Sequence, residues 1–400
     1  MLNGAAWGIS YLIRPEVRMI RAWVGLGRDL LASRWSLLLI FTITALFGHI
    51  EEGLPINQLV GWFVICGLGL VPLARMIAEM VEALADKLGD RIGGLISVAL
   101  GNLVELVVSF TALASGLYHL VVISVAGAVI TNCLLVLGIS TCVGARKKAT
   151  IEIHPYSTGL QSQQLLISTI FLAVPTVFHL ANVFNLREKA AAISDGSSAF
   201  DSFASYSLIV SVLVLAFYLL SFAYQMGTGR SLYLRKEEEL VLPPEGEHKP
   251  LSVILGMLLL VSIVLVGVSE NLVESLQLMV DGAHLNPLFV GLFLLPLFGS
   301  FSEALISVKA AATNRMDLAM ASTVESSVQL LLFVLPLLVI CGIPMGRYLH
   351  LAVPATSLFC LGATVLAVHW ITENRKLSWY EGSLLLTLYA VIGAGTLFLG

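Results

Sequence analysis

Two short motifs place a glutamate deep inside apolar sequence. Gly-Asn-Leu-Val-Glu at 101–105 lies in the apolar run 92–116, and Gly-Ser-Phe-Ser-Glu at 299–303 lies in the run 288–312. An ionisable residue in a membrane helix costs ~2.5–3.5 kcal/mol, so its usual reason is function. Beyond the glutamates the copies align without a gap: Ser109 with Ser307, Ala112 with Ala310, Leu134 with Leu332. We therefore interpret the chain as an internal repeat organised around Glu105 and Glu303.

The chemistry of this pair is that of a hard-cation site. Two facing carboxylates, with nearby carbonyl, amide and hydroxyl oxygens, match the ~6–8 oxygen ligands that Ca²⁺ takes in a flexible cage. Neither motif contains His or Cys, which argues against zinc or copper. Two buried carboxylates without a cation repel each other, so at least one should hold a proton. The pair therefore predicts a site that binds either a divalent cation or protons.

Composition indicates a membrane protein. The chain is 58% hydrophobic and 12% charged, whereas soluble domains carry ~25% charged residues. Its net charge of -4 gives no case for nucleic-acid binding. The five cysteines lie singly in apolar segments and are expected to be buried thiols. No HExxH, GxSxG or Walker motif is present, so neither an enzyme nor a primary pump is expected, and no permanently bound cofactor.

Roughly eleven apolar runs are long enough to cross ~30 Å of hydrocarbon. They lie near 35–50, 57–80, 92–115, 119–143, 160–180, 205–226, 251–269, 287–312, 317–342, 348–369 and 379–399. The expected fold is an all-α polytopic membrane protein in which a first helix is followed by two inverted five-helix repeats. Its expected parts are a basic cytoplasmic N-terminal segment with the first transmembrane helix (1–56), the first repeat (57–226), a charged cytoplasmic linker (227–250) and the second repeat (251–400).

The distribution of Lys and Arg predicts the orientation. With the N-terminus in the cytoplasm, the outer loops receive only Arg187, Lys189 and Arg347, as the positive-inside rule requires. The chain then crosses the membrane an odd number of times between Glu105 and Glu303, so the two copies run in opposite directions. Inverted repeats of this kind are typical of secondary transporters, whose substrate site lies near the midplane.

Longer segments around both motifs resemble a known family. The first signature consists of Leu-Gly-Asp-Arg-Ile-Gly-Gly-Leu at 88–95, which continues into 101–106, and of residues 127–138. The second consists of Asn-Arg-Met-Asp-Leu at 314–318 and of residues 326–329 and 333–336. An acidic segment precedes each signature, at 82–84 and at 269–273. Over roughly residues 57–399 the chain resembles the cation/proton exchangers, the calcium:proton branch of the calcium/cation antiporter superfamily. The resemblance implies a secondary antiporter that exchanges Ca²⁺ for H⁺ across a lipid bilayer by alternating access.

The resemblance also implies roles for particular residues. Glu105 and Glu303 would be the central ligands and proton carriers, and further residues would add oxygens at the site: Gly101, Asn102, Gly299 and Ser300. Asn132 and Gln329 would face the cavity from the following spans, while Glu82 and Glu270 would lie on the access route or, alternatively, on a solvated helix face.

The chain departs from the family pattern at several positions. Ser300 stands where Asn is usual, Ala304 where His is usual, Ser97 for Asn, Ala128 for Ser, and Glu325 for Gly. If the helix that carries Ser326 and Gln329 faces the cavity, Glu325 would be a third carboxylate within reach of the pair. The alternative is a glutamate hydrogen-bonded in a helix interface, since buried carboxylates need partners.

Two other functions stay open at this stage. One is a Na⁺- or K⁺-coupled exchanger of the same superfamily, and the other is a membrane sensor that binds cations without transporting them. The absence of a convincing signal peptide favours a bacterial inner membrane, with a vacuolar-type membrane as the alternative.

Overall fold

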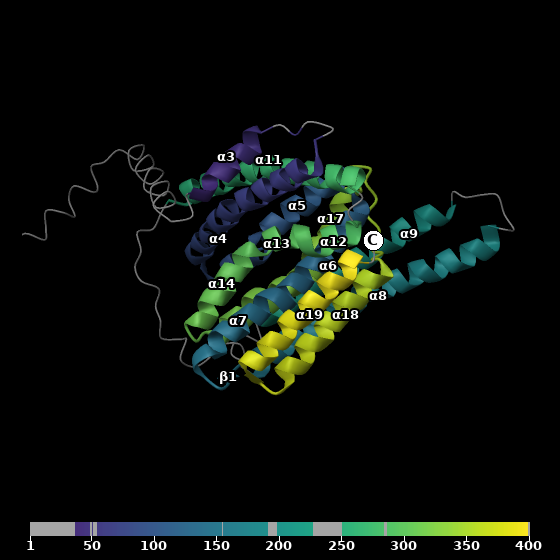
Figure 1. Ribbon diagram of the computed structural model, residues 1–400. Helices are drawn as coiled ribbons and strands as arrows, with labels where there is room; N and C mark the ends of the chain where they lie inside the picture. The colour runs from purple at the N-terminus through teal and green to yellow at the C-terminus, as the bar shows by residue number, and fades with distance from the viewer. Residues whose placement is uncertain are drawn as a thin grey trace, which may run out of the picture.

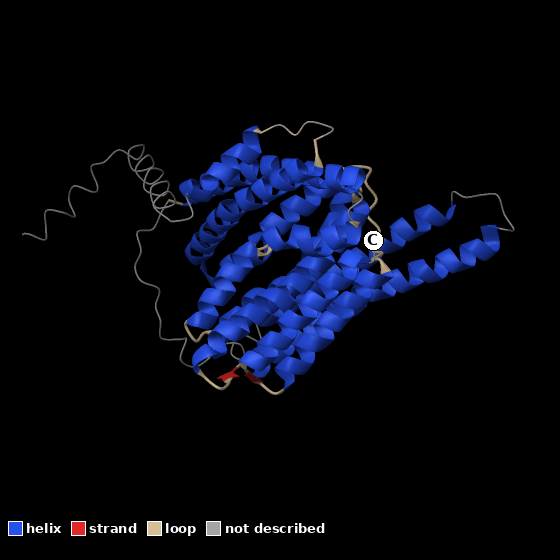
Figure 2. Cartoon of the chain, viewed as in Figure 1, coloured by secondary structure: helices blue, strands red, loops and turns tan. Residues whose placement is uncertain are grey.

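The computed structural model describes residues 37–48, 50, 54–153, 155–190, 198–226, 250–283 and 286–398, and these are almost entirely helical (Figure 2). The helices of the first half are α3 (Leu39–Phe47), α4 (Ile56–Leu100), α5 (Leu103–Ala114), α6 (Tyr118–Ile130), the π-helical turn η2 (Thr131–Val136), α7 (Leu137–Gly144), the 3₁₀ turn η3 (Ala145–Lys147), α8 (Pro155–Ala190) and α9 (Ser198–Met226). The basic N-terminal segment and most of the linker expected at 227–250 lie outside the described residues.

The second half follows the same order. It contains α11 (Leu251–Ala283), α12 (Pro287–Phe289), the π-helical turn η5 (Val290–Leu294), α13 (Leu295–Gly299), α14 (Phe301–Ala312), α15 (Met316–Met320), the π-helical turn η6 (Ala321–Glu325), α16 (Ser326–Gln329), the π-helical turn η7 (Leu330–Val334), α17 (Leu335–Gly342), α18 (Ala355–Glu373) and α19 (Trp379–Phe398). The spacing that separates Glu105 from Glu303 also separates Val136 from Val334, so η2 and η7 end at matching places in the two repeats.

The predicted count of eleven spans is not confirmed. Among the described residues, eight helices are long and apolar enough to cross a membrane, and the bent pair Pro287–Gly299 and Phe301–Ala312 would make a ninth. The two predicted spans that fall short are those at 35–50, where α3 has 9 residues, and at 92–115, where α5 has 12.

Helix α4 differs from the expected pair of separate spans. It has 45 residues and continues from Ile56 to Leu100 through the loop expected near 81–91. Seven of the eleven residues at 81–91 are Ala, Leu, Glu, Lys or Arg and none is Pro, so this part of the sequence favours helix. The interruption falls instead at Gly101 and Asn102, directly before the first motif's glutamate.

The helices enclose two apolar cores. One lies between α3, α4 and α11, which run together on one side of the molecule (Figure 1), and includes Leu70 and Leu272. The other lies among α6, α7, α8, α9 and the helices from α15 to α19, and includes Leu134 and Leu332. Helices α5 and α13 lie between these two groups of helices (Figure 1), so the motifs that they carry are held at the junction.

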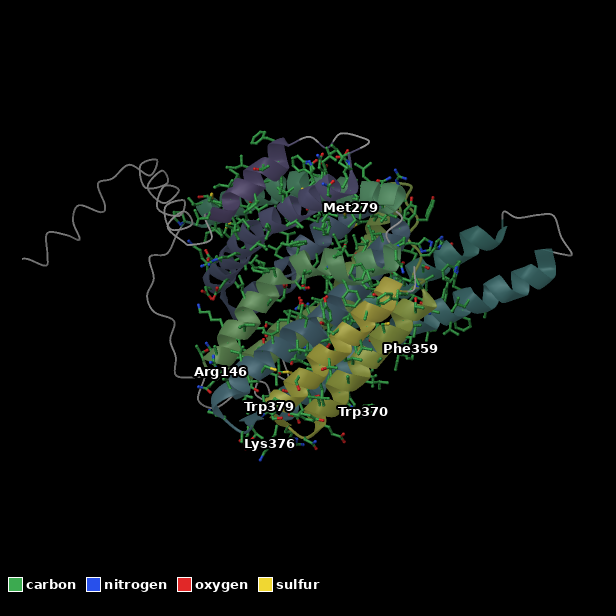
Figure 3. The ribbon with its side chains drawn as sticks, viewed as in Figure 1. Arg146, Met279, Phe359, Trp370, Lys376 and Trp379 are labelled. Carbon is green, nitrogen blue, oxygen red and sulfur yellow. The ribbon has the colours of Figure 1, made fainter. Side chains whose placement is uncertain are left out.

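One end of the molecule carries polar and aromatic side chains. There β1 (Ile151–Glu152) pairs antiparallel with β2 (Lys376–Leu377), and Lys376 Nζ lies 3.7 Å from Glu152 Oε1. Arg146, Lys376 and the exposed rings of Trp370 and Trp379 lie toward this end (Figure 3). Exposed tryptophans beside basic residues are typical of a membrane interface.

Candidate cation site

Each motif lies where a membrane helix is interrupted. In the first, α4 ends at Leu100 and α5 begins at Leu103, with Asn102 at φ -106° and ψ 34°. In the second, α13 ends at Gly299 and α14 begins at Phe301, and the helix axis bends by 60°. Glu105 and Glu303 both lie in the first turn after the interruption. The positive end of the helix dipole there favours a negative side chain.

The two glutamates are buried and lie near one another. Glu105 is 7% exposed and Glu303 6%, and their carboxylates interact electrostatically. A Cβ on Gly299 would lie 3.6 Å from Cγ and 3.7 Å from Oε1 of Glu105. The first repeat's carboxylate therefore rests against the second repeat's interruption. Glu303 accepts a hydrogen bond from Ser302 Oγ at 2.8 Å.

A small cavity of about 20 Å³ lies beside Glu105. Its polar lining comes from Glu105 and Ser109 of α5 and Ser124 of α6. The rest is Gly299 and apolar side chains of α4, α5, α6, α11, α13 and η7. A cavity of this size holds about one water molecule, and a dehydrated cation also fits in such a space. We call it the site cavity.

Asn102 ties the two repeats together. Its Nδ2 donates to Gln329 Oε1 at 2.7 Å, and its Oδ1 accepts from Ser326 Oγ at 2.7 Å. Its backbone carbonyl accepts from the amide of Leu106. The structure thus brings these three predicted residues together as a clasp between the start of α5 and α16, whereas a role of Asn102 as a cation ligand stays a prediction.

Several polar atoms near the interruptions are buried without a hydrogen-bond partner among the described residues. They are Oε1 of Glu105, Oγ of Ser300 and both amide atoms of Asn132. A buried polar atom left unpaired costs ~1–3 kcal/mol, so oxygens of this kind are available to a cation. Asn132 is fully buried in η2, and π-helical turns are frequent at functional sites.

The remaining predicted residues lie elsewhere. Glu325 accepts a hydrogen bond from Gln161 Nε2 of α8 at 3.3 Å. Tyr218 of α9 lies close enough to interact electrostatically with the Glu325 carboxylate. Glu82 on α4 and Glu270 on α11 are exposed, as is Gly101, and none of these residues lines the site cavity. Their proposed contributions stay predictions.

Sequence reasoning missed two hydroxyls of the site cavity and the partner of Glu325. Ser109 lies one turn after Glu105, and i, i+4 neighbours share a helix face, so its position was available from the sequence. Ser124 and Gln161 come from other helices, and their positions depend on tertiary packing.

Comparisons with known proteins identify the family. The family model for the sodium/calcium exchanger protein matches residues 58–227 and 253–397. The chain belongs to this family. The predicted resemblance is therefore confirmed at the level of the family, and the match spans both repeats.

Two curated relatives match over most of their length. The chain is 30% identical over 356 residues to a Ca²⁺/H⁺ antiporter of Synechocystis sp., covering 84% of this chain and 92% of the relative. It is 32% identical over 369 residues to a Ca²⁺/H⁺ antiporter of Aphanothece halophytica, covering 90% and 95%.

Solved structures show the same fold. The structure of native YfkE superimposes with a TM-score of 0.70 at 25% identity, covering 91% of this chain and 99% of that one. The crystal structure of the H⁺/Ca²⁺ exchanger CAX gives a TM-score of 0.64 at 17% identity, covering 94% and 93%. The predicted class, an all-helical membrane protein built from two repeats, agrees with these neighbours.

Proposed function

We propose that this protein is a secondary antiporter that exchanges Ca²⁺ for H⁺ across a membrane. The observation that carries the proposal is the meeting of two buried glutamates from two helix interruptions, with Glu105 against Gly299. The names of the two cyanobacterial relatives support Ca²⁺ as the cation and H⁺ as the counter-ion.

The pair couples the two ions because it cannot hold both at once. Ca²⁺ needs ionised carboxylates and several further oxygens, while protons neutralise those same carboxylates. When Ca²⁺ leaves, the pair is stabilised by taking up a proton, and when Ca²⁺ binds, that proton must leave. Glu105 and Glu303 would act as ligands and proton carriers, with oxygens from Ser109, Ser124, Ser300 and Asn132 completing the set.

The membrane orientation is part of the proposal. We place the end with β1, β2 and Lys376 in the cytoplasm, because the positive-inside rule assigns the basic loops there. The opposite end, where α5 is followed by α6 and where residues 343–354 join α17 to α18, then faces outward. A bacterial inner membrane is the proposed location.

Glutamine variants of the pair test the function. Wild-type protein in proteoliposomes should take up radioactive calcium when an outward proton gradient is imposed, without Na⁺ or K⁺. Glu105→Gln and Glu303→Gln should each abolish this uptake, because glutamine can neither ionise nor exchange a proton. Thermal stability in detergent should show that both variants fold. Robust pH-driven uptake by either variant would refute the mechanism.

A further inference from the structure

Three histidines gather around a cavity at the outward end of the molecule. This cavity, which we call the outer cavity, has a volume of about 400 Å³. Its lining includes His119 at the start of α6, His179 in the second half of α8, and Tyr348 and His350 of the segment that joins α17 to α18. His119 is exposed, while His179 and His350 are half-buried. None of these side chains belongs to the cation site.

A second cavity adjoins the outer cavity and lies on the side of it nearer to Glu105 along α6 and α11. It has a volume of about 260 Å³, and we call it the middle cavity. Tyr118 and His119 line both the outer and the middle cavity, and α11 contributes Leu276 to the middle one. His119 therefore stands on the border between the two.

The middle cavity approaches the site cavity along two helices. On α6, Ser124 lines the site cavity and lies five residues from His119, roughly 7–8 Å along the axis. On α11, Leu272 lines the site cavity and Leu276 the middle cavity, one turn or roughly 6 Å apart. The three cavities thus follow one another from the outward end toward Glu105.

The groups around His119 suit proton transfer better than cation binding. The titratable and charged groups near it in the described residues are Tyr118, His179, Arg347, Tyr348 and His350, with Glu274 on α11 one turn from the cavity-lining Gln277. Neither cavity is lined by a carboxylate, and Arg347 Nη1 donates to Tyr118 Oη at 3.5 Å. A fixed positive charge beside Tyr118 discourages Ca²⁺ from being held there.

His350 also interacts electrostatically with the other two histidines. Burial, with His179 and His119 nearby, lowers the pKa of His350. The described residues contain no group of three or more His, Cys, Asp or Glu side chains that could hold a metal ion. Imidazole is the side chain whose ordinary titration falls near neutral pH.

We propose that His119 carries protons between the water of the outer cavity and the route to Glu105. The inference rests on the proposed Ca²⁺/H⁺ exchange and adds a proton-transfer residue to it. One ring nitrogen of His119 takes a proton from water in the outer cavity, and the other nitrogen releases its proton to water in the middle cavity, from which Glu105 is protonated. The imidazole ends neutral, so one proton has moved inward and none is consumed.

A comparison of two transport modes tests this role. Ca²⁺/H⁺ exchange needs proton transfer, whereas exchange of radioactive for unlabelled Ca²⁺ across proteoliposomes does not. In His119→Gln, Ca²⁺/H⁺ exchange at alkaline pH should fall about tenfold. This is less than the ~10²–10⁴-fold effect typical of a positioned acid or base, because water can partly substitute for the imidazole. The loss should shrink at acidic pH, and Ca²⁺ self-exchange should stay at the wild-type rate. His179→Gln is the matched control, since it lines the outer cavity alone, and it should behave like wild type.

The outcomes separate the two ideas. If wild-type protein shows no proton-coupled Ca²⁺ flux, the proposed function fails. If wild type exchanges Ca²⁺ for H⁺ and His119→Gln does so with the same rate and pH profile, the relay is refuted. Equal slowing of both transport modes in His119→Gln would also overturn it, because that pattern indicates a packing defect.

Discussion

At the scale of single residues, Glu325 shows how one hydrogen bond changes an expectation. The sequence left two roles for it, a third carboxylate near the pair or a partner in a helix interface. The structure gives it Gln161 on α8, and Glu325 is half-buried away from the lining of the site cavity. Its contact therefore supports the interface role.

Two substitutions of Glu325 distinguish these roles. Glu325→Gln keeps hydrogen-bonding capacity toward Gln161, so Ca²⁺ affinity and the pH profile of transport should match wild type. Glu325→Leu leaves the Gln161 amide without this partner and should lower the stability of the folded protein by ~1–3 kcal/mol. Flux assays and thermal unfolding in detergent measure the two effects. A shifted pH optimum in Glu325→Gln would restore the third-carboxylate hypothesis.

Competition between ions at Glu105 and Glu303 predicts a pH dependence of binding. Protonation removes the negative charge that holds Ca²⁺, so the apparent affinity for Ca²⁺ should fall as the pH is lowered and rise as it is raised. Isothermal titration of the purified protein at several pH values measures this. An affinity that does not change from acidic to alkaline pH would mean that the proton follows another path.

At the scale of elements, α6 and η5 approach each other through glycines. A Cβ on Gly127 would lie 2.6 Å from the carbonyl oxygen of Gly291 and 2.6 Å from Cα of Leu292, and a Cβ on Gly291 would lie 2.6 Å from Cγ2 of Ile123. The backbones are in direct contact, which only glycine allows. This contact fixes α6, which carries Ser124 and continues into η2 with Asn132, against the helical segment that leads to Gly299.

Alanine at Gly127 should therefore be harmful. It has to displace backbone atoms, and overpacking of this kind costs ~1–3 kcal/mol, so the melting temperature and the yield of folded protein should fall. Gly362→Ala on α18 is the control, because a Cβ there meets no atom within 4 Å. Similar melting temperatures for the two variants would show that α6 and η5 can move apart at little cost in stability.

The sequence located the two central glutamates of the candidate site more accurately than it located the helices that carry them. Glu105 and Glu303 were visible because a charge stands out in an apolar run and because the repeat aligns them. The continuity of α4 was missed, since the polar stretch near 81–91 was interpreted as a loop although its residues favour helix. The pairings of Asn102 with Gln329 and of Glu325 with Gln161 join residues far apart in the chain, and neither hydropathy nor periodicity encodes such contacts.

At the scale of the whole molecule, orientation can be tested at its two ends. Tyr348 is 52% exposed, and the Lys376 side chain is 58% exposed. With the five native cysteines replaced, an impermeant maleimide should label Tyr348→Cys in intact cells. Lys376→Cys should be labelled only after the membrane is permeabilised. The reverse pattern would invert the proposed topology and place the histidine-lined cavity inside.

Among the described residues, the clasp made by Asn102 has no equivalent at the matching positions of the repeat. The repeat aligns Asn102 with Ser300 and Ser326 with Ala128. Alanine cannot accept or donate a side-chain hydrogen bond, and Ser300 Oγ has no partner among the described residues. In an inverted-repeat transporter, facing the opposite side of the membrane amounts to the two halves exchanging conformations. Two extra hydrogen bonds at one of the two matching junctions between the halves, at ~0.5–1.5 kcal/mol each, make that exchange uneven. The resting protein should therefore spend most of its time open to one compartment.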